Sequence, residues 1–373
     1  MRKTFKYRIY PTKSQLTSIE NILELTRWVY NETLALRKKA WETEKKSISL
    51  YESQKELTKW KQEKPELKNV YTQALQQAQV RVDFAFKSFF RRCKKEEKPG
   101  YPRFKGPGRY KSITFPQNQF GFRLYPTESK VYLSKIGDVK IVLHRPIQGV
   151  IKTCTIKREP SGKWFITFSC DKVEKPEPLP QTGKIVGIDL GLMTYVQCSD
   201  GTKIDKPRFF KKEQKELTRI QNKVQSKKTK HTEALIHERI KNKREDFCHK
   251  TANKLVKKYD FIAHEDLDTK NMLEQKKYSK SIADAAWATL VEFITFKAEN
   301  AGRYRNGVNP RGTSQRCSQC GAEVSKDITV RVHNCPQCGY KAPRDLNSAL
   351  EVLRLGMQSA EYRAYVATRQ GPG

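Results

Sequence analysis

The chain has 373 residues, enough for two or three domains that each bury a core. It carries 74 Lys and Arg against 40 Asp and Glu, and the resulting net charge of +34 is typical of proteins that bind a polyanion, most commonly nucleic acid. We find no run of eighteen apolar residues and no apolar leader after Met1, which argues against a transmembrane or exported protein. We therefore expect a soluble, basic, intracellular protein of several domains.

The chain is expected to begin with a strand and continue into helices. Residues 3–10 alternate polar and apolar side chains, with one basic face, and end at Pro11. Apolar residues then recur at helical spacing, and Ser14 is the expected N-cap of the first helix. Three helices are predicted, at about residues 12–37, 45–61 and 70–92.

The composition changes at Lys98. Residues 98–111 mix turn formers with Arg, Lys and aromatic residues, and their Pro and Gly exclude a helix. This mixture suits an extended loop on a phosphate backbone with rings available for stacking, although an ordinary basic linker has the same composition. The candidate nucleic-acid contacts here and in the first strand are Tyr7, Arg8, Tyr101, Arg103, Phe104 and Lys105.

Short alternating segments follow the loop. They are expected at residues 112–115, 121–124, 131–133, 139–143, 150–158 and 164–169. Strands at this spacing predict a small β-barrel or sandwich, which the first strand completes. The predicted domains are a barrel from residues 1–11 and 98–175, a helical domain inserted at 12–97, and a linker over 172–180.

The second half opens on a strand that contains an acid. Residues 184–192 read as a buried strand with one carboxylate, Asp189, near the end. A buried acid is costly unless it is paired or bound to a cation, so Asp189 is either a strand-end cap or a metal ligand. Glu265 ends a later short strand at residues 261–267, and Asp345 opens the last predicted helix.

A basic region separates the first two acids. We expect a β-hairpin over residues 194–204 and two helices with a basic break between them. Residues 206–258 contain 18 Lys and Arg against six Asp and Glu, which suits phosphate contacts, although solubility alone accounts for part of this charge. The candidate contacts are Lys227, Lys228 and Lys230. The helices are predicted at residues 211–224 and 233–258, with a further one at 281–301.

Four of the nine cysteines form two pairs, Cys317-x2-Cys320 and Cys335-x2-Cys338, fourteen residues apart. Four thiolates in two turns are the ligand set of a structural, tetrahedral zinc site, and a glycine follows each pair where such a turn needs a positive φ. The other five cysteines are scattered singly. With an odd total, they indicate a reducing compartment rather than a disulfide framework.

The order of elements gives the acids a joint meaning. The predicted order of elements is strand, hairpin, helix, strand and helix. This order, with acids at the ends of two strands and at the start of a helix, matches an RNase H-like nuclease core. Such cores hydrolyse phosphodiesters with two Mg²⁺ ions, about 3.5–4 Å apart, held by clustered carboxylates. Asp189, Glu265 and Asp345 are therefore the predicted catalytic residues and magnesium ligands.

The sequence resembles the TnpB (OrfB) proteins of insertion sequences, which are RuvC-like RNA-guided nucleases related to compact type V CRISPR effectors. The similar blocks lie at residues 7–12, 29–31, 101–105, 187–191, 265–267, 313–321 and 344–349. The resemblance implies a multidomain α+β protein in which a zinc ribbon at 313–342 interrupts a RuvC-like domain at 183–312 and 343–373. One departure is Pro343, which stands where many relatives carry another Asp; Asp345 itself is present.

The resemblance also implies an RNA-guided DNA endonuclease of a transposable element. The barrel (wedge) and helical (recognition) domains would recognise a target-adjacent motif and hold a guide RNA derived from the transposon end. Pairing with that RNA would read double-stranded target DNA. We expect a monomer in the prokaryotic cytoplasm, associated with the nucleoid and not with a membrane. The alternatives are a nuclease-silent RNA-guided DNA-binding regulator and a transposase or accessory DNA-binding protein.

Overall fold

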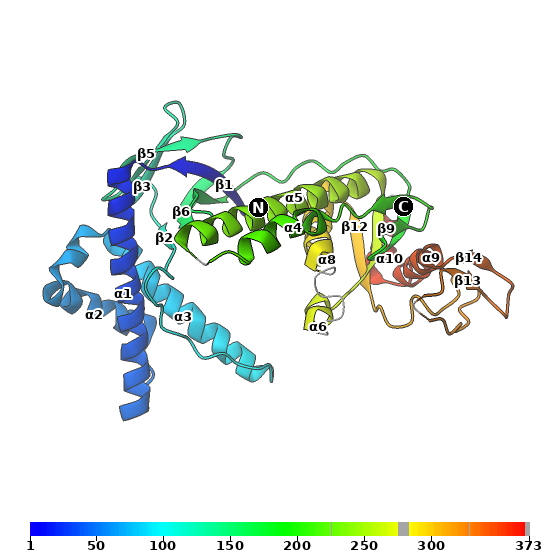
Figure 1. Cartoon of the computed structure of the whole chain (residues 1–373), viewed down its shortest axis with the longest axis horizontal. Helices are drawn as coiled ribbons and strands as arrows, with labels where there is room; N and C mark the ends of the chain where they lie inside the picture. Colours follow the sequence, from blue (N-terminus) through cyan, green and yellow to red (C-terminus); the bar gives the residue numbers. More distant parts are fainter. Residues whose placement is uncertain (225, 275–282, 328, 370–373) are drawn as a thin grey trace. The chain divides into compact units, whose positions relative to one another are not determined.

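The computed structural model describes residues 1–224, 226–274, 283–327 and 329–369 (Figure 1). The chain divides into two compact units, Met1–Glu174 and Lys175–Gly373. The division falls inside the stretch with linker composition at residues 172–180. No helix in the described ranges has both the length and the apolar character needed to cross a membrane.

Unit 1 begins with β1 (Lys3–Tyr10) and continues into helices. These are α1 (Lys13–Glu44), α2 (Leu50–Glu63), the short 3-10 helix η1 (Pro65–Asn69) and α3 (Thr72–Lys94). The N-cap of α1 is Thr12, so the prediction of Ser14 was wrong. The reason is a reciprocal capping box, in which Thr12 and Gln15 each bond the other's backbone N–H and leave Ser14 inside the first turn.

Six later strands join β1 in one antiparallel sheet. They are β2 (Ser112–Phe115), β3 (Phe122–Tyr125), β4 (Lys130–Leu133), β5 (Gly137–Val142), β6 (Val150–Arg158) and β7 (Trp164–Asp171). The order is β2-β6-β7-β1-β5-β4-β3, so β1 lies at the centre and pairs with both β5 and β7. The helices are therefore an insertion between the first two strands of this sheet, as the strand pattern indicated.

The sheet of unit 1 curls into a near-barrel. Phe122 of β3 packs against Phe168 of β7, with ring centroids 6.1 Å apart, although three strands lie between them in the sheet. Tyr71, which precedes α3, stacks on Phe115 of β2 and lies against Gly121 just before β3. The start of α3 thus covers the opening between the two edge strands.

Unit 2 is built on a five-stranded sheet of order β10-β9-β8-β11-β12. Its strands are β8 (Ile185–Asp189), β9 (Thr194–Cys198), β10 (Lys203–Asp205), β11 (Phe261–Glu265) and β12 (Tyr304–Val308). Strand β9 pairs antiparallel with both β8 and β10, whereas β11 runs parallel to both β8 and β12. The sequence did not predict β12, because an edge strand of this kind is only partly buried and needs few apolar residues.

Helices cover both faces of this sheet. One face carries α5 (Lys227–Lys258) and α8 (Trp287–Ala301), and the other carries α9 (Arg344–Gly356) and α10 (Ala360–Arg369). The remaining elements are α4 (Phe209–Gln221), α6 (Thr269–Glu274), β13 (Val332–Asn334) and β14 (Lys341–Pro343). The helix expected over residues 281–301 is helical at 283–285 and, after a turn at Ala286 with φ of 54°, continues as α8 from Trp287; its predicted start at 281–282 lies outside the described residues.

Candidate functional site

Asp189 and Glu265 end neighbouring parallel strands at the same edge of the sheet. Ile188 of β8 lies opposite His264 of β11 in the parallel pair. The next residues, Asp189 and Glu265, therefore lie side by side at the ends of the two strands. Side chains alternate along a strand, and both acids therefore lie on the face covered by α9. The fold brings together two residues that are 76 positions apart in the sequence.

Helix α9 brings the third acid to this edge because glycines let it approach the strands closely. A Cβ added to Gly187 of β8 would lie 2.2 Å from the carbonyl oxygen of Ala349 in α9. One added to Gly356 of α9 would lie 2.4 Å from the Cβ of Ala263 in β11. Asp345 stands in the first turn of this helix and interacts electrostatically with Asp189.

We call Asp189, Glu265 and Asp345 the acidic site; the other two carboxylates repel that of Asp189, which is poorly solvated. Burial raises the pKa of Asp189 well above its usual range, and the charges of Glu265 and Asp345 raise it further. Arg344 lowers the pKa of Asp189, but it is the smallest of the four influences. Burial also raises the pKa of Glu265, which is 8% exposed. A divalent cation would relieve this repulsion.

The acidic site fits an open magnesium site better than a closed cage. Mg²⁺ prefers oxygen ligands, usually takes only one or two carboxylates, and fills its other positions with water and phosphate oxygens. Within the described ranges, one group of three or more His, Cys, Asp or Glu side chains has all its ligand atoms within 4.8 Å of one another. This group is the four paired cysteines, so the three acids are not packed as closely.

A hydroxyl group that sequence reasoning did not assign to the site contacts Glu265. Thr313 is fully buried, and its Oγ1 donates a hydrogen bond to Glu265 Oε1 at 2.5 Å. This bond opposes the effect of burial and lowers the pKa of Glu265. The only signal in the sequence was the position of Thr313 at the start of the 313–321 block.

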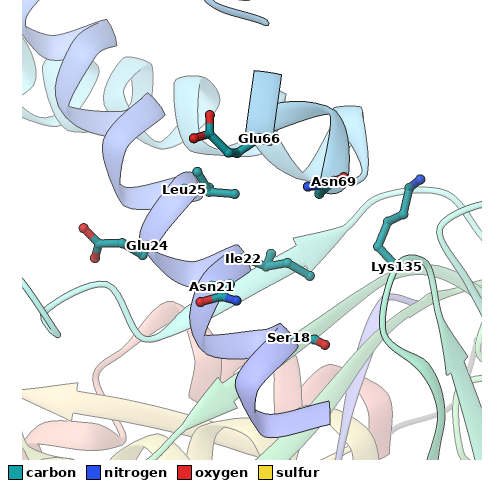
Figure 2. A pocket seen from close by; sticks show the side chains of 8 residues that line it. All are labelled: Ser18, Asn21, Ile22, Glu24, Leu25, Glu66, Asn69 and Lys135. Atoms are coloured by element: carbon teal, nitrogen blue, oxygen red, sulfur yellow. The ribbon is translucent and has the colours of Figure 1, made fainter. Parts of the chain in front are cut away.

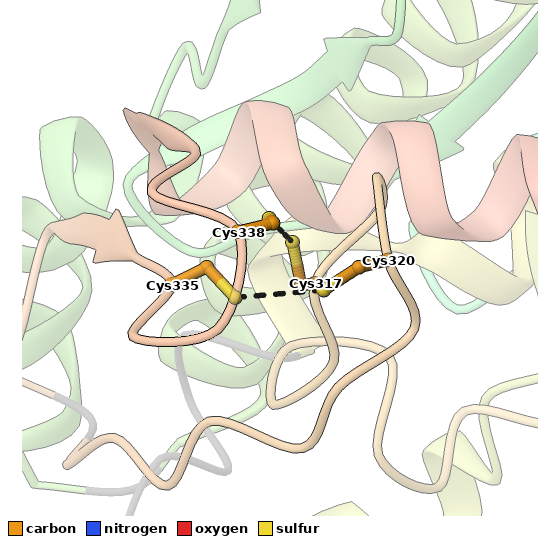
Figure 3. A group of neighbouring side chains, drawn as sticks. All are labelled: Cys317, Cys320, Cys335 and Cys338. Carbon is orange, nitrogen blue, oxygen red and sulfur yellow. Dashed lines mark hydrogen bonds between the residues drawn. The ribbon is translucent and has the colours of Figure 1, made fainter.

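The four paired cysteines converge from two loops (Figure 3). Their sulfurs lie 3.7 Å apart for Cys317 and Cys338, and 3.5 Å apart for Cys320 and Cys335. Tetrahedral zinc with bonds of about 2.3 Å places its sulfurs about 3.8 Å apart, so the geometry fits a zinc ion. Each pair forms a knuckle, a tight turn closed by a glycine with φ of 76° or 72°. The cluster predicted from the spacing is confirmed.

The environment of one thiol also suits metal binding. Backbone N–H groups of Cys338 and Gln337 donate to Cys335 and lower the pKa of its thiol to about 6. Metals bind the thiolate form, which these N–H groups favour at Cys335, whereas burial and contacts with the other three thiols raise the pKa of Cys338 to about 12. The four-Cys ribbon, residues 313–342, is tied to α9 through the buried side chain of Asn347, which bonds the backbone of the first knuckle.

The structure distinguishes among the predicted nucleic-acid contacts of unit 1. Tyr7 is 1% exposed and its hydroxyl donates to the carbonyl of Arg145, so its ring belongs to the core and is not available for stacking on a base. Arg8 donates to the carbonyl of Trp164 and lies over the ring of Phe165. These two residues are better explained as part of the near-barrel.

The loop at residues 98–111 is attached to α1 and presents exposed side chains. Asn31 donates to the carbonyl of Lys105 at 3.0 Å and accepts from its backbone N–H at 2.8 Å. Arg103 is exposed, Phe104 is 52% exposed and Tyr101 is 44% exposed. The 29–31 and 101–105 blocks of the sequence are thus in direct contact, and the contact leaves basic and aromatic groups facing solvent.

The basic residues Lys227, Lys228 and Lys230 are exposed in the first turn of α5, which Ser226 caps. The predicted break between the helices is therefore shorter than expected, because α5 begins at Lys227 instead of 233. Positive charge at a helix N-terminus opposes the helix dipole. An anionic partner would offset this repulsion.

A separate pocket of about 410 Å³ lies in unit 1 between α1, η1 and the β4–β5 turn (Figure 2). Its charged side chains, Glu24, Glu66 and Lys135, are exposed, and Glu24 is already paired with Arg27. We assign no function to this pocket.

Three segments match known families. Residues 1–46 match "Helix-turn-helix domain" (HTH_OrfB_IS605), although here they form β1 and the single long helix α1. Residues 168–276, which include Asp189 and Glu265, match "Probable transposase" (OrfB_IS605). Residues 287–352, which include the four cysteines and Asp345, match "Cas12f1-like, TNB domain".

Whole-length similarity is found as well. A solved structure titled as a Cas12f1–sgRNA–target DNA complex matches 95% of this chain and 99% of the solved chain, at 18% identity and a TM-score of 0.37. "Putative RNA-guided DNA endonuclease InsQ" of Escherichia coli K12 is 28% identical over 95% of this chain and 92% of its own length. "Putative RNA-guided DNA endonuclease" of Streptomyces pristinaespiralis is 31% identical over 96% of this chain and 90% of its own length. With that likeness over almost its entire length, the chain belongs to the TnpB (OrfB) family.

Proposed function

We propose that this protein is an RNA-guided DNA endonuclease of a transposable element that hydrolyses target DNA by two-metal chemistry. The observation that carries the proposal is the convergence of Asp189, Glu265 and Asp345 from two strands and a helix onto one edge of the unit 2 sheet. A buried acid whose pKa is raised by two neighbouring acids, as that of Asp189 is, is costly for stability alone and useful for holding cations. The order β10-β9-β8-β11-β12, with the acids at these positions, supports a RuvC-like assignment.

In this proposal the residues of the acidic site hold two Mg²⁺ ions. When bound, the ions would activate the attacking water and stabilise the leaving oxygen of the phosphodiester. Asp189 and Glu265 would hold them from the sheet, and Asp345 would hold them from the start of α9. The packing of α9 on β8 holds the helix-borne acid close to Asp189. The four-Cys ribbon, with a structural zinc ion, would support this arrangement without taking part in the chemistry.

The proposed partners are a guide RNA from the transposon end and double-stranded target DNA. The names of two relatives as RNA-guided DNA endonucleases support this, as does the net charge of +34. We further propose that unit 1 holds the RNA scaffold and reads a target-adjacent motif, using the exposed loop at residues 98–111. The protein would act as a monomer in the prokaryotic cytoplasm, at the nucleoid.

The proposal is tested with protein purified from cells that carry its native flanking DNA. Sequencing the bound RNA should identify one discrete species, and the complex should cleave DNA that pairs with it in the presence of Mg²⁺. Asp189→Asn should lower single-turnover cleavage on the order of 1,000-fold or more and leave RNA binding unchanged. Asp205→Asn, at an exposed acid of β10, is the matched control and should cleave normally.

The alternatives give different results in the same experiment. Guide-directed DNA binding by the wild type without any cleavage would indicate the nuclease-silent regulator. Joining of labelled DNA ends without RNA would indicate a transposase. Full cleavage by Asp189→Asn would overturn the catalytic assignment of the acidic site.

A further inference from the structure

We propose that Thr313 is a positioning residue for Glu265, which fixes one oxygen of that carboxylate and leaves the other for a metal ion. The inference rests on the proposed function, because it takes Glu265 as a metal ligand of the acidic site. It also gives the entrance of the four-Cys ribbon a direct part in shaping that site.

The backbone explains why Thr313 reaches Glu265. Val308, the last residue of β12, lies opposite Glu265 in the parallel β11–β12 pair. The chain then turns back at once, and two hydrogen bonds close the turn. The backbone N–H of Arg311 donates to the side chain of Asn309, and the backbone N–H of Thr313 donates to the carbonyl of Pro310. Five residues after Val308, the chain has returned to the end of the neighbouring strand.

The Thr313 hydroxyl has one proton and two acceptors within reach. Glu265 Oε1 lies at 2.5 Å and the carbonyl oxygen of Pro310 lies at 2.9 Å. An ionised carboxylate is the stronger acceptor, and an O–H···O⁻ bond of about 2.5–2.7 Å is characteristic of such a pair. The proton therefore goes to Glu265, in a setting where both side chains are almost completely buried.

The bond acts on one oxygen only. Throughout the described ranges, Thr313 is the single hydrogen-bond donor to the Glu265 carboxylate, and it bonds Oε1. Oε2 is left to bind a cation, with its direction set by the Oε1 bond. Hydrogen bonds of this kind orient metal-ligating carboxylates, and losing one typically costs about 10–100-fold in metal affinity or activity.

The ribbon holds Thr313 in place from the other side. Thr313 precedes Cys317 by four residues, and the intervening turn is closed by N–H bonds from Gln315 and Arg316 to the carbonyl of Gly312. The segment that carries the hydroxyl is therefore anchored both to the sheet edge and to the first knuckle.

The experiment compares three variants in the full-length, zinc-loaded protein. Thr313→Val removes the hydroxyl and keeps the shape, and Thr313→Ser restores the hydroxyl. Thr295→Val is the matched control, because Thr295 lies in α8 of the same unit and donates only to the carbonyl of Val291 in its own helix. Zinc content and thermal unfolding verify that each variant is folded; if Thr313→Val loses zinc, Thr313→Ala takes its place.

The first measurement is Mn²⁺ binding to the protein by electron paramagnetic resonance, which needs neither RNA nor DNA. The Mn²⁺ that the Asp189→Asn variant still binds is counted as bound outside the acidic site. Thr313→Val should weaken the Mn²⁺ affinity by about ten-fold or more, whereas Thr313→Ser and Thr295→Val should stay within about two-fold of wild type. The second measurement is single-turnover cleavage against Mg²⁺ concentration, in which Thr313→Val should need correspondingly more Mg²⁺.

The outcomes separate this inference from the proposed function. Wild-type affinity and cleavage in Thr313→Val would overturn the positioning role while the nuclease assignment stands. A wild type that does not cleave, but binds Mn²⁺ more tightly than Thr313→Val, would support the positioning role and reject the activity. A wild type with no Mn²⁺ binding above that of Asp189→Asn, together with no cleavage, would overturn both.

Discussion

Asn347 joins the helix that carries Asp345 to the backbone that precedes and follows Cys317. Its Oδ1 accepts a hydrogen bond from the N–H of Ser318 at 3.0 Å, and its Nδ2 donates to the carbonyl of Arg316 at 2.7 Å. The side chain is completely buried. These two bonds tie the first knuckle to the first turn of α9, and the ribbon strands β13 and β14 also lie against this helix (Figure 1).

Asn347→Ala should destabilise unit 2 and loosen the ribbon. The buried N–H of Ser318 and the partly buried carbonyl of Arg316 would lose their partners, at a cost of about 1–3 kcal/mol for a buried group. Urea unfolding should report the loss of stability, and zinc release to a chromogenic chelator should become faster. Asn300→Ala is the control, because Asn300 bonds only a carbonyl of its own helix. Equal stability of the two variants would contradict this role of Asn347.

Gly187→Ala should separate α9 from β8. The new methyl group would lie 2.2 Å from the carbonyl oxygen of Ala349, so the helix must move, which typically costs about 1–3 kcal/mol. Thermal unfolding should show the destabilisation, and cleavage should fall because Asp345 moves with the helix. Gly307→Ala meets no atom closer than 3.4 Å and should change thermal stability much less. Unchanged stability of Gly187→Ala would show that the helix is not held this closely.

Cys335→Ser should remove the zinc ion. Three thiolates hold zinc less tightly than four, and metal binding supplies much of the folding energy of such small elements. Metal analysis of the purified variant should show substoichiometric zinc. Cys93→Ser, at an exposed cysteine outside the cluster, should retain the wild-type content. A wild-type protein without zinc would show that the cluster binds another metal or none.

Asp200→Asn should lower stability at neutral pH and not at low pH. Partial burial alone would raise the pKa of Asp200, but hydrogen bonds from Lys258, Tyr259 and the Thr202 backbone outweigh it and hold the pKa well below its usual range. A depressed pKa adds stability that is complete above the unfolded-state pKa of about 4 and is lost as the pH falls below it.

The expected difference in unfolding free energy between wild type and Asp200→Asn is on the order of 1 kcal/mol after solvent screening. It should be constant from pH 7 to about pH 4.5 and should shrink below about pH 4. Denaturant titrations across this range measure it. Asp246→Asn is the control, because its carboxylate is exposed and pairs only with Lys250 on the helix surface. A difference that grows on acidification would contradict the assigned sign.

Arg103→Ala should weaken nucleic-acid binding in a salt-dependent way. If Arg103 contacts one phosphate, its loss should reduce the slope of log affinity against log salt by about 0.7–0.9. Filter binding to single-stranded RNA at several salt concentrations measures the slope. Arg2→Ala removes the same charge from unit 1 at an exposed residue paired with Asp171, and it should leave the slope unchanged. An identical slope for Arg103→Ala would remove this residue from the interface.

Composition and pattern predicted much of this architecture, but they failed where local signals compete. The alternation of Tyr7 and Arg8 with polar residues indicated a strand correctly, yet it could not tell that the Tyr7 ring enters the core. Ser14 and Thr12 are both good N-caps by type, and only the reciprocal bond with Gln15 distinguishes them. The edge strand β12 was missed because a half-buried strand has a weak apolar signal.

The sequence alone determined the features that depend on residue type and short spacing. These include the basic charge, the strand ending at Asp189 and the four-thiol cluster, because a zinc ligand set is encoded within a few residues of each cysteine. The sequence also predicted that Asp189, Glu265 and Asp345 belong to one site, but only the tertiary structure decided how they meet and what holds them. Strand register places Glu265 beside Asp189, a turn after β12 brings Thr313 to Glu265, and the close packing of α9 on β8 brings Asp345 near Asp189. Those long-range relationships leave no local pattern, since each depends on packing between segments far apart in the chain.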